Sequence, residues 1–198
     1  MSFLLGCLFA YLLGGVPFSL LLVRLLAGVD LRTIGSGNVG ATNASRAFEK
    51  PWRLPVFLAV YLLDTAKGFV PAWWFAAWFG GPGAAPVVYG ACAIVGHCAS
   101  PYLRFRGGKG VATATGVMLA LDPFALLCGL AAFFAVLGLT RQVFLGSLAL
   151  GVALAAAIVL RDPATAFGAR LPVTVFGLAV MLLLFFTHRG NLRKMVRR

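Results

Sequence analysis

Apolar segments long enough to cross a lipid bilayer occupy most of this chain. A helix needs about 20 consecutive apolar residues to span the hydrocarbon core, and runs close to that length recur from Ser2 to Thr187. Hydrophobic residues make up 61% of the 198 residues and charged residues only 11%, whereas soluble domains carry about 25% charged residues. The sequence therefore predicts an all-α integral membrane protein, with residues 1–198 forming a single membrane-embedded domain.

Seven apolar segments are the predicted membrane spans. Gly14, Gly15 and Pro17 interrupt the first of them, and Asp122-Pro123 separates the fourth from the fifth. Because proline disfavours the helical conformation for the residue before it, we expect two crossings here rather than one long kinked helix. The expected spans are 2–26, 54–79, 84–103, 111–121, 124–139, 143–160 and 171–187.

The basic residues lie almost entirely on one side of this seven-span arrangement. Arg161 and Arg170 fall in the opposite loops, and Lys67 lies within a span. Basic loops stay in the cytoplasm, so we expect the N-terminus outside and the C-terminus inside. The predicted cytoplasmic set is Arg24, Arg32, Arg46, Lys50, Arg53, Arg104, Arg106, Lys109, Arg141, Arg189, Arg193, Lys194, Arg197 and Arg198.

The net charge of +12 follows from this topology. On a soluble protein the same excess would suggest nucleic acid as a partner. On a membrane protein it reflects the positive-inside rule and attraction to anionic lipid headgroups. We therefore expect membrane lipid, and no nucleic acid, among the partners.

Two further features fit a protein that stays in the membrane. The four cysteines lie within apolar runs without Cys-x-x-Cys spacing, so they are predicted to be buried small hydrophobic residues. The N-terminal segment has no basic region and no clear small-residue cleavage site, so we expect a retained first span rather than a signal peptide.

The most polar run of the chain is Gly35-Ser36-Gly37-Asn38-Val39-Gly40-Ala41-Thr42-Asn43. Its glycines allow positive φ and a close approach of the backbone, and successive N–H groups in such a loop can bind an anion. The spacing also satisfies Gly-x-Gly-x-x-Gly, but the strand and the acidic residue of a dinucleotide site are absent. A flexible linker is the alternative, although the polar side chains and the nearby Arg46 exceed what a linker needs.

A second glycine-rich loop, Arg106-Gly107-Gly108-Lys109-Gly110, precedes a helix that we expect to begin near Val111. It differs from a P-loop because Gly110, and not Ser or Thr, follows the lysine. It nevertheless combines a flexible backbone, one cation and a helix N-terminus, which favours bound phosphate. An ordinary basic loop at the membrane boundary is the alternative.

The remaining ionisable residues offer little for acid–base or metal chemistry. Asp64 and Lys67 lie one turn apart within the second span and are predicted to form a structural ion pair. The two histidines, His97 and His188, have no nearby acidic partner, so we expect no metal site. His97 and Cys98 point in different directions on a helix, which disfavours a nucleophile pair.

The sequence is therefore rich in phosphate-binding groups and poor in bases and nucleophiles. Neither histidine begins a His-x4-Asp motif, because residues 102 and 193 are Tyr and Arg, and no Gly-x-Ser-x-Gly elbow occurs. An enzyme of this kind would act by positioning phosphorylated reactants and stabilising charge. A transporter or binding protein for an organic phosphate anion is the alternative, but the polar groups gather on one face instead of extending through the core.

Three sequence motifs resemble those of the bacterial acyl-phosphate:glycerol-3-phosphate acyltransferase (PlsY) family. They are the Gly35–Asn43 run, His97-x3-Pro101 with Phe105-Arg106-Gly107-Gly108-Lys109-Gly110-Val111-Ala112-Thr113, and His188-Arg189-x-Asn191-Leu192-Arg193. Asp64-x-x-Lys67-Gly68 is also similar, and the resemblance covers essentially the whole chain. The family's third motif usually continues to Leu-x-x-Gly-x-Glu, whereas Arg198 occupies the glycine position here and the sequence ends before the glutamate.

The resemblance implies transfer of a fatty acyl group from acyl phosphate to the 1-hydroxyl of glycerol 3-phosphate, giving 1-acylglycerol 3-phosphate (lysophosphatidate) and phosphate. It implies seven membrane helices, a site at the cytoplasmic face of the bacterial inner membrane, and no use of acyl-CoA, cofactor or metal. The catalytic residues it implies are Ser36, Arg46, Lys109, Ser147, His188 and Asn191. The substrate-binding residues it implies are Gly35, Gly37, Asn38, Gly40, Thr42, Asn43, His97, Gly107, Gly108, Gly110 and Thr113.

Overall fold

The computed structural model describes residues 1–197, and all regular secondary structure within them is helical. Arg198, the residue at the family's glycine position, lies outside the described residues. The chain divides into two compact units, residues 1–117 and residues 118–198. The all-α prediction is confirmed for the described part of the chain.

The helices follow one another with short connections. The first unit contains α1 (Ser2–Gly15), α2 (Phe18–Ala27), η1 (Leu31–Thr33), α3 (Ala41–Ala44), η2 (Ser45–Ala47), α4 (Arg53–Phe79), α5 (Ala85–Cys98) and η3 (Pro101–Leu103). α6 (Val111–Leu121) crosses the boundary between the units. The second unit continues with α7 (Pro123–Thr140), α8 (Val143–Arg161), α9 (Pro163–Ala166) and α10 (Leu171–Val196).

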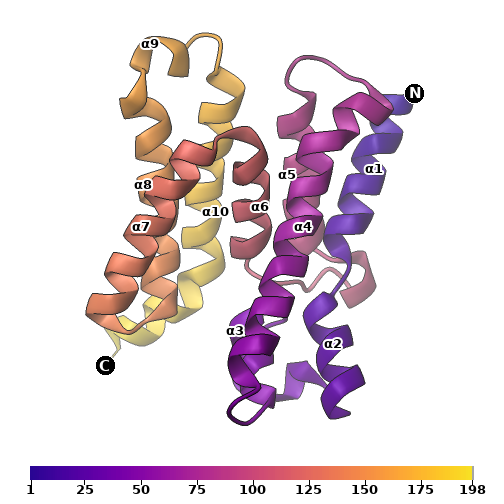
Figure 1. The fold of residues 1–198 in the computed structure, drawn as a ribbon, viewed down its shortest axis with the longest axis vertical. Coiled ribbons are helices and arrows are strands. Elements are labelled where there is room, and N and C mark those ends of the chain that lie inside the picture. The colour runs from indigo at the N-terminus through magenta and orange to yellow at the C-terminus, as the bar shows by residue number, and fades with distance from the viewer. Residues whose placement is uncertain (198) are drawn as a thin grey trace. The chain divides into compact units, whose positions relative to one another are not determined.

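In the first unit, α1, α4 and α5 pack side by side (Figure 1). Glycine makes the closest of these contacts possible, because a Cβ added to Gly14 would overlap the backbone of Ala93. A Cβ on Gly96 would overlap the carbonyl oxygen of Tyr11 in the same way. Small residues commonly let membrane helices approach this closely, because packing and not apolar burial holds helices together in lipid.

The same principle joins α4 to α6. Gly68 on α4 lies against the backbone of Thr113, and Gly116 on α6 lies against the carbonyl group of Thr65. The chain between α5 and α6 carries the second glycine-rich loop, so this packing fixes the helix that follows the loop.

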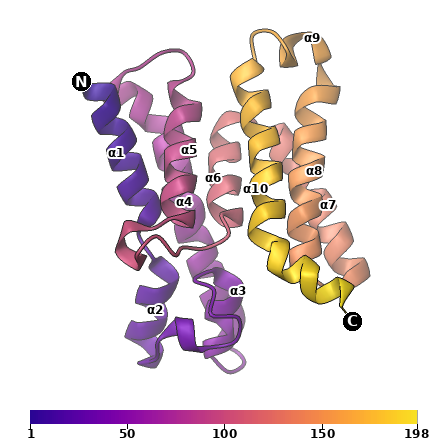
Figure 2. The same ribbon diagram turned by 180° about the vertical axis from the view of Figure 1, so that it is seen from behind.

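In the second unit, α8 lies between α7 and α10 (Figure 2). Gly151 of α8 faces Met181 of α10, and Gly177 of α10 faces Ile158 of α8. Proline occupies the first turn of both α7 and α10, where its missing N–H group costs no helical hydrogen bond. The predicted break is confirmed, because α6 ends at Leu121 and α7 begins at Pro123.

The helices match the predicted spans closely in position but not everywhere in length. Five helical stretches are long and apolar enough to cross a membrane, namely 2–27, 53–79, 123–140, 143–161 and 171–196. α5 and α6 are shorter, with 14 and 11 residues. The structure therefore supports a multi-pass membrane protein, and the count of seven crossings stays a prediction.

Two predicted boundaries differ from the structure. α5 ends at Cys98 instead of 103, because Pro101 restricts Ser100 to an extended conformation and the chain then turns through η3. The last helix continues to Val196, nine residues beyond the expected end at 187. The basic tail is therefore helical, and it carries both His188 and Asn191.

Candidate functional site

The first polar loop folds around one buried amide, that of Asn43. Its Oδ1 accepts a hydrogen bond from the backbone N–H of Ser36 at 3.1 Å, and its Nδ2 donates to the carbonyl oxygens of Leu31 and Ile34 at 3.2 and 3.0 Å. Asn43 is only 2% exposed. Three hydrogen bonds to the loop's own backbone make Asn43 the residue that fixes the loop's shape.

Two glycines let this loop pass close to its neighbours. Gly35 and Gly37 adopt φ values of +53° and +69°, which side chains disfavour. A Cβ on Gly35 would lie 2.6 Å from Asn43 Oδ1 and 3.3 Å from Nη1 of Arg46. The positive φ expected for glycines of this loop is thus confirmed at these two positions, whereas Gly40 is extended at φ −135°. The close approach brings the Arg46 guanidinium against the loop.

The polar side chains of this loop differ in exposure. Ser36 and Arg46 are exposed, whereas Asn38 and Thr42 are half-buried. Gly40 faces the Asn38 amide, since a Cβ there would lie 2.9 Å from Nδ2. Ser36 and Arg46 are therefore the groups of this loop best placed to contact a soluble anion.

The second glycine-rich loop packs directly onto the end of α5. The N–H of Gly107 donates to the carbonyl of Cys98, and that of Gly108 donates to the carbonyl of His97, both at 3.0 Å. Gly108 also lies close to the imidazole ring of His97, where an added Cβ would be 2.2 Å from Nε2. His97, predicted to bind substrate, is 7% exposed, and its ring packs against Gly108 of this loop.

Lys109 follows these contacts and is half-buried. Removal from water lowers the pKa of its ammonium group from the ordinary lysine value. Gly110, at φ +83°, directly precedes α6. Its carbonyl oxygen accepts a hydrogen bond from the N–H of Ala114 at 2.8 Å. Thr113, also predicted to bind substrate, is fully buried against Gly68 of α4. The predicted start of this helix at Val111 is confirmed.

A buried ionic network lies behind the second loop. Nζ of Lys67 is 2.7 Å from Oδ1 of Asp64 and donates to the carbonyl of Val16 at 2.8 Å. Nδ1 of His97 is 3.9 Å from the same Asp64 oxygen. The predicted Asp64–Lys67 pair is therefore confirmed, whereas the expectation that His97 has no acidic partner nearby is wrong. It connects the break between α1 and α2 to the histidine under Gly108.

The remaining predicted catalytic residues belong to the second unit. Ser147 on α8 donates its hydroxyl to the carbonyl of Val143 at 3.0 Å. Nδ1 of His188 lies 2.8 Å from the carbonyl of Leu184, one turn back on α10. Asn191 is half-buried and follows His188 at i+3, on the same side of the helix. That these three residues act together with Ser36, Arg46 and Lys109 stays a prediction.

An ion cluster around Asp122 was not predicted from the sequence. Its Oδ1 accepts the N–H of Ala125 at 3.0 Å and so caps α7, and its Oδ2 accepts from Nη2 of Arg170. Nη1 of Arg161 lies 4.0 Å from Oδ1. The available signal was an acidic N-cap residue directly before a proline, which typically starts a helix.

The cysteines differ in burial from the prediction. The four cysteines are free thiols, and each is partly rather than fully buried, which corrects the burial predicted for them. Exposed apolar surface is common on helices of this protein, so a thiol on a helix face need not be buried by protein. Within residues 1–197, no three His, Cys, Asp or Glu side chains gather as a metal-binding group.

Comparison with known families extends over nearly the entire chain. The family model described as "Glycerol-3-phosphate acyltransferase" matches residues 4–198. A protein of that name from Anaeromyxobacter dehalogenans (strain 2CP-1) is 44% identical over 98% of this chain and 95% of its own length. One from Myxococcus xanthus is 39% identical over 96% and 94% of the two chains.

Solved structures give the same relationship. The crystal structure of PlsY, an integral membrane glycerol 3-phosphate acyltransferase, in its glycerol 3-phosphate form is 32% identical and has a TM-score of 0.86. It covers 100% of this chain and 93% of that chain. The lysophosphatidic acid form of PlsY is 29% identical, with a TM-score of 0.84.

Proposed function

Because this chain belongs to the glycerol-3-phosphate acyltransferase family, we propose that it uses acyl phosphate as the donor and acylates the 1-hydroxyl of glycerol 3-phosphate. The products are lysophosphatidate and inorganic phosphate. The observation that carries the proposal is the pair of glycine-rich loops in the first unit. A cation lies close to the glycines of each loop: Arg46 against Gly35, and Lys109 next to Gly108.

The two loops suit reactants that each carry a phosphate. Backbone N–H groups in glycine-rich loops and cationic side chains stabilise phosphate without a proton transfer. The exposed Ser36 hydroxyl adds a neutral donor in the first loop. We assign Ser36, Arg46 and Lys109 to phosphate binding, and Ser147, His188 and Asn191 to the same reaction. The remaining predicted residues, from Gly35 to Thr113, bind the substrates or shape the loops that surround them.

The chemistry needs no nucleophile from the protein. The glycerol 1-hydroxyl oxygen attacks the carbonyl carbon of the acyl phosphate and forms the ester bond. The carbonyl carbon–oxygen bond to phosphate then breaks, and phosphate leaves with that electron pair. The hydroxyl proton passes to a phosphate oxygen of a substrate, so no protein base is required. The protein contributes position and charge stabilisation.

The place of the reaction is the second part of the proposal. The basic loops identify the face that carries both glycine-rich motifs, and basic loops remain in the cytoplasm. We place the site at the cytoplasmic face of a bacterial inner membrane, where glycerol 3-phosphate is soluble and the acyl product enters the lipid. A reporter fused after residue 198 should be cytoplasmic, and a periplasmic signal would contradict the orientation.

Activity of the purified protein tests the reaction. Acyl phosphate with radiolabelled glycerol 3-phosphate should give lysophosphatidate, and Lys109→Ala should lower kcat/KM by about 10²–10³-fold, as for loss of one charge-stabilising group. Lys194→Ala removes the same charge from the exposed last turn of α10 and should keep full activity. Activity with acyl-CoA but not acyl phosphate would overturn the proposed donor.

Arg46 is tested separately by steady-state kinetics. Arg46→Ala should raise KM for at least one phosphate substrate if the guanidinium binds ground state and transition state alike. Arg53→Ala is the control, because Arg53 instead holds the carbonyl of Phe48 at 3.0 Å. Unchanged kinetics in Arg46→Ala would remove Arg46 from the site.

A further inference from the structure

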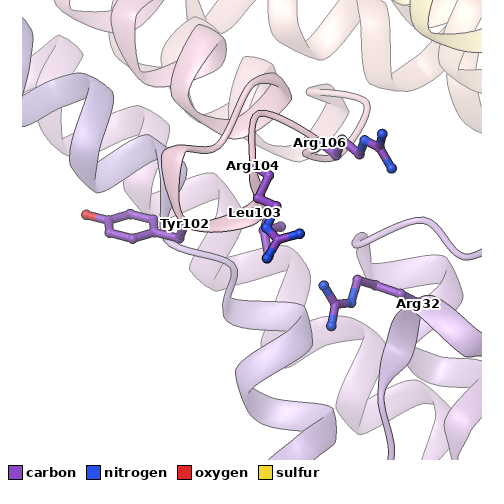
Figure 3. A pocket seen from close by; sticks show the side chains of 5 residues that line it. All are labelled: Arg32, Tyr102, Leu103, Arg104 and Arg106. Atoms are coloured by element: carbon purple, nitrogen blue, oxygen red, sulfur yellow. The ribbon is translucent and has the colours of Figure 1, made fainter.

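A basic cavity of about 540 Å³ opens in the first unit between η1 and the turn after α5. Arg32, Tyr102, Leu103, Arg104 and Arg106 line it. Figure 3 shows the guanidinium groups of Arg32 and Arg104 pointing toward the same space, although the two residues are far apart in sequence. None of these five residues is assigned to the acyl transfer reaction.

The cavity carries more positive than negative charge. Arg32 is paired with Asp30, with Nη2 2.6 Å from Oδ2. This arginine lowers the pKa of Asp30 to about 2, so the carboxylate is ionised at neutral pH. In residues 1–197 no carboxylate pairs with Arg104 or Arg106. Three guanidinium groups and one carboxylate leave two positive charges in excess.

The backbone holds the two unpaired arginines in place. Arg104 and Phe105 have φ values of +52° and +61°, a region that residues other than glycine seldom adopt. The turn is closed by hydrogen bonds from the N–H groups of Leu103 and Phe105 to the carbonyl of Ser100, at 3.1 and 2.8 Å. Arg106 N–H donates to the Leu103 carbonyl at 3.0 Å. The cavity wall is thus a formed turn.

The cavity also lies where membrane helices end. The Ser100 hydroxyl donates to the carbonyl of Gly15, the last residue of α1, at 2.6 Å. Tyr102 and Phe105 beside the arginines are 54% and 68% exposed. Tyrosine side chains gather at the headgroup level of a bilayer, and basic pockets beside membrane helices bind lipid headgroups.

We propose that this cavity binds a phosphate monoester, carried by a membrane lipid of the phosphatidate class. A phosphate monoester carries about −1.5 to −2 charge at pH 7, which balances the two excess arginine charges, whereas a phosphodiester headgroup carries one. Guanidinium groups bind phosphate oxygens in pairs of parallel hydrogen bonds. The position at the ends of α1 and α5 favours a lipid over free phosphate as the source.

Equilibrium binding of radiolabelled phosphatidate to the purified full-length protein, in neutral phosphatidylcholine nanodiscs, tests the proposal. The test variant is Arg104→Gln, and the control is Arg141→Gln. Arg141 is also an exposed arginine at positive φ (+56°) at the end of a helix, but it lies outside the cavity. Arg104→Gln should weaken binding by about tenfold or more, as for loss of a charged hydrogen bond. Arg141→Gln should stay within about twofold of the native protein.

Additional variants and ligands distinguish lipid phosphate from free phosphate, and loss of a contact from misfolding of the turn. Arg104→Lys keeps a cation and should recover part of the affinity, which a merely misfolded turn would not. The double variant Arg104→Gln with Arg106→Gln should bind more weakly than either single variant. Equal loss in Arg104→Gln and Arg141→Gln would overturn the site in favour of general attraction to a basic surface. Binding of inorganic phosphate without retention of phosphatidate would overturn the lipid source.

Discussion

The ion cluster of the second unit and the basic cavity of the first unit use arginine in opposite ways. The buried carboxylate of Asp122 accepts a hydrogen bond from Arg170, lies near the guanidinium group of Arg161 and caps α7. In the basic cavity, Arg32 is paired with Asp30, whereas Arg104 and Arg106 have no carboxylate partner in the described residues. The first arrangement is complete within the protein, whereas the second needs an anion from outside.

This difference distinguishes structural charge from binding charge. The Arg161 guanidinium also lies 4.8 Å from the centre of the Phe124 ring, so it contacts both an anion and an aromatic face. The buried Asp64–Lys67 pair of the first unit likewise matches one carboxylate with one ammonium group. Arg46 and Lys109, which we propose bind the phosphates of the reactants, lie in or beside glycine-rich loops. Removing a carboxylate should therefore destabilise the complete clusters and strengthen anion binding in the incomplete one.

Asp64→Asn should have the largest effect, because it leaves the Lys67 ammonium buried without its anion. Loss of one partner of a buried pair costs about 3–5 kcal/mol of unfolding free energy. Heating with a thiol-reactive probe, followed by peptide mass spectrometry, should show faster labelling of Cys98, which ends α5 in the same unit. Asp64→Leu with Lys67→Met should restore stability, and a double variant as unstable as Asp64→Asn would refute the charge explanation.

Asp122→Asn should have the next largest effect, and it should act on the second unit. The amide can still cap α7, but Arg170 loses its charged acceptor, at a cost of about 1–3 kcal/mol. Among the four thiols only Cys128 lies in the second unit, so its labelling on heating should accelerate more than that of Cys98. Asp162→Asn is the matched control, since Asp162 is an exposed cap of the short helix α9. Equal acceleration at both thiols would show that the two units unfold together.

The helices were largely predictable, because apolar runs and prolines act locally. Asp122-Pro123 marked a helix start from sequence, and the same rule at Ser100-Pro101 would have shortened α5. The helical tail was missed because hydropathy indicates where a chain leaves the membrane and not where its helix ends. Arg193 and Lys194 in the last turn favour the helix dipole.

The candidate site was predictable in composition but not in geometry. Glycines and cations identified both loops. The three backbone groups that form hydrogen bonds with the Asn43 amide, by contrast, depend on the path of the folded loop. An asparagine bonding to nearby backbone is a common pattern, yet its partners at residues 31, 34 and 36 cannot be read from spacing. His97 was assigned to substrate from its motif, but its ring is covered by Gly108.

The pH dependence of glycerol 3-phosphate binding should show whether the Lys109 ammonium group binds this substrate. Burial lowers the Lys109 pKa, so its charge is present below that lowered pKa and lost as pH rises through it. The dissociation constant measured by calorimetry should therefore rise about tenfold when the charge is lost, as for one charged hydrogen bond. Lys109→Arg keeps its charge throughout and should give a flat profile. A native profile equally flat would contradict a binding role for this ammonium.

Asp30→Asn should have the smallest effect and the opposite sign from the other carboxylate variants. Asn can still accept the backbone N–H of Arg32, which caps η1, so the loop keeps its local fold. The cavity would then carry three unbalanced guanidinium charges, and phosphatidate binding should tighten by about threefold, since exposed charges interact weakly in water. Because the paired carboxylate has a pKa of about 2, lowering the pH of the native protein within its working range would not reproduce this gain. Weaker binding in Asp30→Asn would mean that Asp30 orients Arg32 for the ligand, and the cavity would then resemble the complete cluster at Asp122 more than its charge indicates.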